Sequence, residues 1–286
     1  MSFFDFFKRK PKPKKLGLAL GGGGARGFTH LGALKAFEEN GIKFDYVAGT
    51  SAGSLVGAFL CAGFSADQII DFAKTLKIKD IKKNKIAFMP SSTEGIENVV
   101  KQNLGDINFK DLKIPFCAVA VDIKAGKEVN IKSGNLSKAV AGSCAVPGVF
   151  NPVDFGNFRL MDGGLQNTIP SDVVKKMGAD IVIAVDVNPN RGYGTDSTKI
   201  FDIMMASIRI LMKSNAVKGK LYADVILEPD TKKFKSTKLQ GAAEMIQLGY
   251  ESAMEKMDEI KSLINSYGIK DRKRIKNGKE KKQAKN

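Results

Sequence analysis

The sequence predicts a single three-layer α/β/α domain built on a central, mostly parallel sheet. Three observations support this fold class: strand-like runs alternate with helix-like segments, several runs are apolar throughout, and glycine-rich turns follow the first two runs. A strand without polar alternation is typical of a parallel sheet that helices cover on both faces. A chain of 286 residues is long enough to bury one large core of this kind.

The apolar pattern places the expected elements in order along the chain. Strands are predicted at 16–20, 46–50, 114–123, 127–131, 158–164, 179–187 and 223–228. Helices are predicted at 29–41, 52–63, 66–77, 95–103, 136–148, 171–178, 199–216 and 240–265, with Pro147 ending the fifth of them. We therefore expect a domain over residues 15–268, an N-terminal tail at 1–14 and a disordered C-terminal tail at 269–286.

The net charge of +16 is concentrated in the two tails. Residues 1–15 carry six Lys or Arg and one Asp, and residues 270–286 carry nine Lys or Arg and two acidic residues. The body between them is left with a charge of only +4, so it is not a basic platform for specific nucleic-acid binding. Four Phe within the first seven residues, followed by Lys and Arg, suggest peripheral contact of the tails with an anionic membrane.

Three cysteines, Cys61, Cys117 and Cys144, lie among apolar or small residues without C-x-x-C spacing. This pattern favours reduced, buried thiols over a disulfide or a zinc site. The start of the chain lacks the apolar core of a secretion signal, and no run approaches the length of a membrane span. We expect a cytoplasmic protein, peripheral on the inner face of the membrane if the tails bind lipid.

The segment Gly49-Thr50-Ser51-Ala52-Gly53 joins a predicted strand to a predicted helix. Such a turn projects the serine hydroxyl, while the next amide and the helix N-terminus point at the same space. The motif is weak alone, and the α/β-hydrolase fold that commonly carries it needs a histidine after the serine. His30 is the single histidine and precedes Ser51, so we expect it to have a packing or hydrogen-bonding role near the glycine loop.

A serine nucleophile still requires a base, and an aspartate must serve here. Asp162 ends a predicted strand, and the turn Gly163-Gly164 follows it among apolar residues. Burial would raise the pKa of Asp162 toward that of a workable base. The alternative is a plain Asp-Gly turn, and Asp186 is a second carboxylate at the same sheet edge that we expect to be structural.

The glycine loop at 21–27 has two interpretations. "GGGARG" fits the dinucleotide-binding pattern, but the acidic residue expected at the end of the second strand is missing, since Asp45 lies at its start. If the first two strands are parallel neighbours, the loop instead turns its bare amides toward Ser51, as an oxyanion hole requires.

Taken together, "GGGGARG", "GTSAG" and "DGG" in this order resemble the patatin-like phospholipase family, which is related to the catalytic core of cytosolic phospholipase A2. The resemblance covers residues 15–190 and includes "THLGALKAFEENG" at 29–41, "SCAVPGVFNPV" at 143–153 and "DGGLQNTIP" at 162–170. It implies hydrolysis of lipid-type esters, as by a phospholipase A, lysophospholipase or esterase, without a metal or organic cofactor. The competing hypothesis is a non-catalytic lipid-binding or nucleotide-binding protein on the same scaffold.

The resemblance also implies a role for each motif residue. Ser51 would be the nucleophile and Asp162 its base, as a dyad without histidine. The oxyanion hole would use the amides of Gly22, Gly23, Gly24 and Ala52. Supporting roles would fall to Arg26, Gly49, Gly53, Gly163 and Gly164. An acyl pocket is expected to be lined from residues 55–90 and 195–220.

Overall fold

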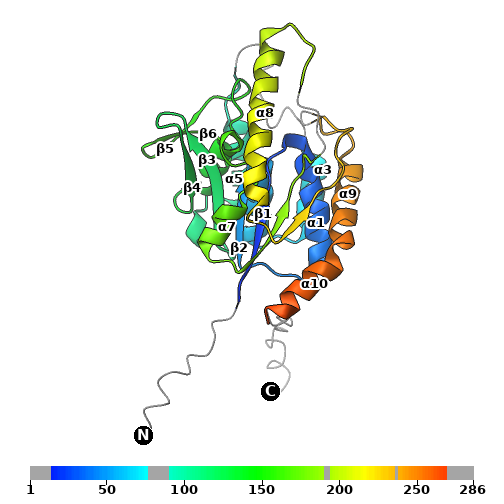
Figure 1. Cartoon of the computed structure of the whole chain (residues 1–286). Helices are drawn as coiled ribbons and strands as arrows, with labels where there is room; N and C mark the ends of the chain where they lie inside the picture. Colours follow the sequence, from blue (N-terminus) through cyan, green and yellow to red (C-terminus); the bar gives the residue numbers. More distant parts are fainter. Residues whose placement is uncertain (1–13, 77–89, 190–193, 236–237, 269–286) are drawn as a thin grey trace, which may run out of the picture.

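The computed structural model describes residues 14–76, 90–189, 194–235 and 238–268, which form three layers around a mixed sheet (Figure 1). The strands are β1 (Leu16–Leu20), β2 (Tyr46–Thr50), β3 (Phe116–Asp122), β4 (Lys127–Ile131), β5 (Val153–Phe155), β6 (Phe158–Asp162), β7 (Ile181–Val185) and β8 (Val225–Leu227). The helices are α1 (Phe28–Glu39), α2 (Ala52–Ala62), α3 (Ala66–Thr75), α5 (Glu94–Leu104), α6 (Leu136–Ser143), α7 (Ser171–Met177), α8 (Ile200–Lys220), α9 (Ala242–Glu255) and α10 (Met257–Ser266). The predicted α/β class is confirmed.

The sheet has the order β5-β6-β3-β2-β1-β7-β8, with β4 paired to β3. The stretch from β3 to β8 is parallel, as predicted. The other edge is antiparallel, because β4 and β6 both run against β3 and β5 runs against β6. Short hairpins join β3 to β4 and β5 to β6, and a few residues cannot make the crossover that a parallel pair needs.

Alternating residues of the central strands divide the core between the two faces of the sheet. On β1, Leu16, Leu18 and Leu20 belong to the larger cluster, which packs under α1, α2, α3, α5, α6 and α9. Ala19 belongs to the smaller cluster on the opposite face, under α7 and α8. A Cβ at Gly17 would lie 2.1 Å from Val174 Cγ1, so α7 packs directly on the backbone there.

The strands β2 and β6 meet end to end along one edge of β3. β2 pairs with residues 116–119 of β3, and β6 pairs antiparallel with residues 120–122. Strand β4 pairs with residues 118–122, so it fills the opposite edge and leaves one edge for both β2 and β6. The carboxyl end of β2 and the carboxyl end of β6 therefore point at each other, at Ser51 and Asp162.

Several predicted boundaries differ from the structure. The helix predicted to run to Pro147 ends at Ser143, because the chain turns there and Ala145 accepts a hydrogen bond from the Asp162 amide at 3.0 Å. The predicted helix at 240–265 is broken at Lys256 into α9 and α10. β5 was not predicted, since three residues are too few for a periodic signal.

The predicted tails lie almost entirely outside the described residues, so the structure does not bear on their hypothetical contact with a membrane. Within the described ranges, no helix combines the length and apolarity that crossing a bilayer requires. The three cysteines are buried and unpaired with one another, as the sequence predicts.

Candidate active site

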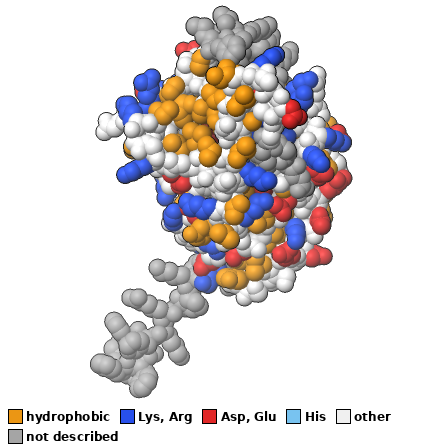
Figure 2. Space-filling view, turned by 45° about the horizontal axis from the view of Figure 1, so that its top comes forward, with side chains coloured by type: hydrophobic (Ala, Val, Ile, Leu, Met, Phe, Trp, Pro, Cys, Tyr) orange, Lys and Arg blue, Asp and Glu red, His pale blue; other side chains and the backbone are white. Residues whose placement is uncertain are grey.

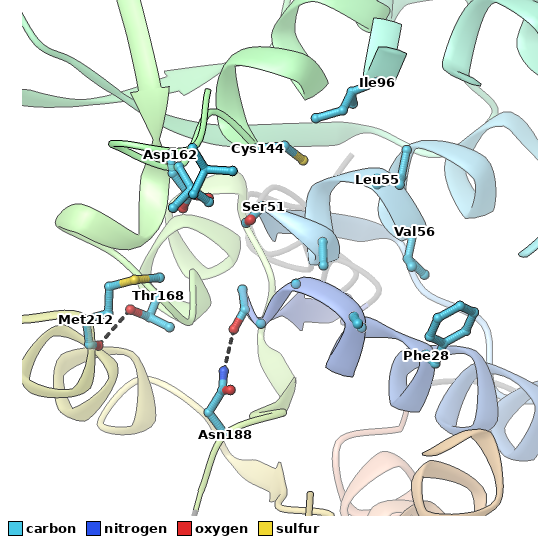
Figure 3. A pocket seen from close by; sticks show the side chains of 18 of the residues that line it. Phe28, Ser51, Leu55, Val56, Ile96, Cys144, Asp162, Thr168, Asn188 and Met212 are labelled. Carbon is cyan, nitrogen blue, oxygen red and sulfur yellow. Dashed lines mark hydrogen bonds between the residues drawn. The ribbon is translucent and has the colours of Figure 1, made fainter. Parts of the chain in front are cut away.

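A cavity of about 720 Å³ opens where β1, β2 and β7 end, and it contains both Ser51 and Asp162 (Figure 3). Its lining is largely apolar and comes from α1, α2, α3, α5, the segment after α6, and α8; it includes Phe28, Leu55, Val56, Phe59, Phe72, Ile96, Val149, Met205, Ile208 and Met212. Residues 55–76 and 201–216 thus contribute as predicted, and the predicted lining at 77–89 lies outside the described residues. The contribution of α5 and of residues 144–150 was not predicted.

Ser51 is held in a strained conformation at the turn between β2 and α2. Its φ of 53° and ψ of −123° make it the one non-glycine residue with a positive φ in the described part of the chain. Such strain concentrates at functional sites because the surroundings must enforce it. Here Gly49 and Gly53 permit the turn: a Cβ on Gly49 would lie 2.3 Å from the Gly53 carbonyl oxygen, and one on Gly53 2.1 Å from that of Leu20.

Hydrogen bonds fix both backbone groups of Ser51. Its amide donates to the Ser143 hydroxyl oxygen at 2.9 Å, and the Ser143 hydroxyl donates to the Val119 carbonyl at 2.6 Å. Its carbonyl accepts from the Ser54 amide and from the Ser54 hydroxyl, at 2.8 and 2.7 Å. The backbone is satisfied in this way, while the Ser51 side chain faces the cavity.

Asp162 is a buried carboxyl group with one unused oxygen. Its Oδ1 accepts a hydrogen bond from the Gly164 amide at 2.8 Å, while its buried Oδ2 has no hydrogen-bond partner among the described residues. Burial raises the pKa of Asp162 to about 6, against the opposing effects of the Ser51 hydroxyl and the Gly164 amide. The two side chains are thus neighbours, although no hydrogen bond joins the Ser51 hydroxyl to Oδ2 in this structure. Catalytic hydrogen bonds are commonly longer or less aligned before substrate binds.

The glycine loop offers fewer free amides than the sequence predicted. The Gly22 amide donates to the Thr168 carbonyl at 3.0 Å, so this predicted oxyanion donor is already engaged. The amides of Gly23, Gly24 and Ala52 have no hydrogen-bond acceptor within the described residues. The Gly22 backbone passes close to the nucleophile, because a Cβ on Gly22 would lie 3.3 Å from the Ser51 Cβ.

Arg26 links the glycine loop to two distant segments of the chain. Its guanidinium is buried and donates to the Phe234 carbonyl and to Asn188 Oδ1, the latter at 2.7 Å. The Asn188 Nδ2 group in turn donates to the Gly22 carbonyl at 2.6 Å (Figure 3). A planar, multiply bonded guanidinium suits this bridging role better than an ammonium would.

The other polar candidates are structural. His30 Nε2 donates to the Gly21 carbonyl at 2.8 Å, and complete burial lowers the pKa of His30 to about 4, so the ring is neutral. Asp186 accepts the Asn188 amide and pairs with Lys220 at 2.8 Å. In the part of the chain that the structure describes, no group of three or more His, Cys, Asp or Glu side chains is arranged to hold a metal ion.

No local pattern in the sequence identifies Ser143, Thr168 or Asn188 as site residues. Ser143 and Thr168 lie within the family-like segments 143–153 and 162–170, which mark their positions but not their roles. Asn188 follows β7 at the carboxyl edge of the sheet, where ligand-side residues gather in such folds.

The fold and the cavity define an α/β/α protein whose apolar pocket is built around a Gly-x-Ser-x-Gly turn. A family model described as Patatin-like phospholipase matches residues 18–175, which is more than half of the chain. The chain therefore belongs to the patatin-like phospholipase family, and its predicted resemblance is confirmed.

Similar proteins extend this result. An uncharacterised NTE family protein of Mycobacterium tuberculosis strain H37Rv is 35% identical over 178 residues, which cover 61% of this chain and 49% of that protein. Neuropathy target esterase sws of Drosophila melanogaster is 30% identical over 257 residues, covering 86% of this chain and 17% of that protein. The chain thus matches at most about half the length of these relatives.

A solved structure, that of VipD from Legionella pneumophila, shares the fold with a TM-score of 0.54 at 15% identity. The match covers 86% of this chain and 67% of that one. At this identity the likeness concerns the fold alone.

Proposed function

We propose that the protein hydrolyses acyl esters of lipids through a Ser51–Asp162 dyad. The observation that carries the proposal is a strained serine beside a buried carboxyl with an unused oxygen, inside a largely apolar cavity. The family membership and the name of the Drosophila esterase support an ester-hydrolysing activity.

The first half of the reaction would form an acyl-enzyme. Ser51 Oγ attacks the ester carbonyl carbon as its proton passes to Asp162 Oδ2, and the carbonyl oxygen becomes an oxyanion. The amides of Gly23, Gly24 and Ala52 would stabilise that charge, at about 3 kcal/mol for a well-aligned donor. The bond to the leaving alcohol then breaks, and the alcohol takes the proton from Asp162.

The second half would release the fatty acid. Water attacks the acyl-serine carbonyl and gives a proton to Asp162, and the bond to Ser51 Oγ breaks as the serine regains a proton. A carboxyl whose pKa is raised to about 6 remains ionised at neutral pH and is a stronger base than an ordinary aspartate. The apolar wall formed by α2, α3 and α5 would hold the acyl chain.

Labelling with a fluorophosphonate followed by peptide mapping tests the proposal. We expect one adduct, on Ser51, and loss of lipid-ester hydrolysis in Ser51→Ala and Asp162→Asn. Ser266→Ala is the matched control and should retain turnover, because Ser266 lies in α10 away from the cavity and its exposed hydroxyl donates to the Leu263 carbonyl of the same helix. Full turnover by folded Ser51→Ala would reject the dyad and favour a binding protein on this scaffold.

A further inference from the structure

Helix α8 carries apolar residues on two faces. Its inner face contributes Phe201, Met205, Ile208, Met212 and Ala216 to the cavity wall. The opposite side, which we call the outer stripe, consists of Ile200, Ile203, Met204, Ile210, Leu211, Val217 and Leu221, with exposed fractions from 40% to 80%. Single exposed apolar residues are ordinary on soluble proteins, but a continuous set on one helix indicates a contact surface.

The outer stripe follows helical periodicity over the whole length of α8, about 30 Å at 1.5 Å per residue. Ser207, Ser214 and Lys218 interrupt it; Lys218 pairs with Asp172 at 3.5 Å, and the two serine hydroxyls bond within the helix. The Ser207 hydroxyl donates to the Ile203 carbonyl at 3.0 Å, and the Ser214 hydroxyl donates to the Ile210 carbonyl at 3.4 Å. Serine hydroxyls bonded back to the preceding turn are compatible with an apolar environment.

Cations lie between the outer stripe and the cavity. Arg209 and Lys213 are four residues apart on one side of α8, and both also line the cavity. Asp202 is the single acidic residue of the helix. Figure 2 shows hydrophobic side chains gathered on the upper part of the molecule, with Lys and Arg side chains around them. An apolar band edged by cations is complementary to a bilayer that contains anionic lipids.

We propose that the outer stripe of α8 docks the protein on an anionic lipid bilayer. The helix would lie in the plane of the surface, so that the cavity wall formed by its inner face adjoins the lipid. The choice of lipid as the occupant rests on the proposed function, because the substrate would pass from the bilayer to the cavity along this helix. A second copy of the chain fits less well, since a twofold contact would bring two sets of the same cations into one interface.

Flotation of the full chain with vesicles tests the docking separately from catalysis. Ser51→Ala serves as the background, so the vesicles stay intact whatever the enzyme hydrolyses. Ile210→Gln with Leu211→Gln should lower the partition coefficient onto phosphatidylcholine vesicles with phosphatidylglycerol about tenfold or more. The matched control, Met254→Gln with Tyr267→Gln, changes two exposed apolar residues on α9 and at the end of α10, and should change it less than twofold.

Other outcomes would overturn the proposal. Equal binding of both double variants would place membrane contact elsewhere, such as in the tails, and absence of binding by the parent chain would reject docking altogether. If the stripe variant binds vesicles as well as the parent chain but changes from dimer to monomer in light scattering, the stripe is a subunit contact. With Ser51 restored, the stripe variant should keep its turnover of a water-soluble ester and lose turnover of vesicle lipid. If the wild-type chain hydrolyses neither substrate, that result would count against the dyad, and the flotation result would still stand.

Discussion

Replacing Asp162 with asparagine should make the protein more stable, relative to wild type, at neutral pH than at acidic pH, while it removes the proposed base. Burial raises the pKa of Asp162 from 3.8 to about 6, so the folded chain holds this proton more tightly than the unfolded chain. The associated stability is present at low pH and is lost as the pH rises through 6. The gap between the two values corresponds to about 3 kcal/mol, of which about 1 kcal/mol is already lost at pH 4.5.

Asparagine keeps an oxygen for the Gly164 amide and has no charge to bury. We therefore expect the free energy of unfolding of Asp162→Asn, relative to that of wild type, to be about 2 kcal/mol larger at pH 8 than at pH 4.5. Any cost of burying the new amide group is independent of pH and cancels in this comparison.

Urea denaturation followed by circular dichroism at pH 4.5, 6 and 8 measures the effect. Ser51→Ala is the control, since it retains the buried carboxyl and should keep a pH dependence like that of the wild type. A stability difference between Asp162→Asn and wild type that stays constant over this range, or that falls as the pH rises, would refute the assignment of a buried carboxylate with a raised pKa.

The remaining predictions concern the turn and its base. Because Asp162 must be ionised to accept the Ser51 proton, initial rates of ester hydrolysis should rise with pH about a midpoint of about 6; a midpoint at 4 would contradict the role of burial. Ser143→Ala leaves the buried Ser51 amide unbonded and should lower the free energy of unfolding by about 1–3 kcal/mol and reduce kcat more than it changes KM, as urea titration and kinetics would show. Gly53→Ala should be destabilised by about 3 kcal/mol or more in thermal unfolding, because its Cβ would meet a backbone carbonyl at 2.1 Å. Gly194→Ala, with nothing within 4 Å of the new Cβ, should stay within about 0.5 kcal/mol of wild type; equal losses at the two glycines would contradict the steric reasoning.

The fold and the turn around Ser51 were predictable because their causes are local. Strands such as β1 and β7 are apolar throughout, and this pattern alone indicates a sheet covered on both faces. Glycines at 49 and 53 are demanded by backbone atoms a few residues away or in the next strand, so the motif itself carries the geometry. Asp162 could be chosen because a strand end followed by two glycines stands at the correct sheet edge.

The rest depended on contacts between distant segments, which no local pattern reports. Ser143 reaches Ser51 across 92 residues, and Asn188 reaches Gly22 across 166. The Gly22 amide is hydrogen-bonded to the Thr168 carbonyl because the glycine loop packs on the segment before α7. The outer stripe of α8 could not be predicted from the sequence for a different reason. A helix that is apolar on both sides has no single apolar face that its periodicity could identify.

The end-to-end meeting of β2 and β6 makes the spacing of the dyad a property of one strand. Thr50, the residue before Ser51, pairs with Val119 of β3, and Asp162 pairs with the next residue of β3, Ala120. Each residue of a strand advances the chain by about 3.3 Å, so the backbone of β3 fixes the distance between Ser51 and Asp162. Lengthening the loops before and after these strands would reshape the cavity without moving the reacting groups apart. One extra residue in the middle of β3 would do the reverse, leaving the cavity walls in place and drawing nucleophile and base out of reach.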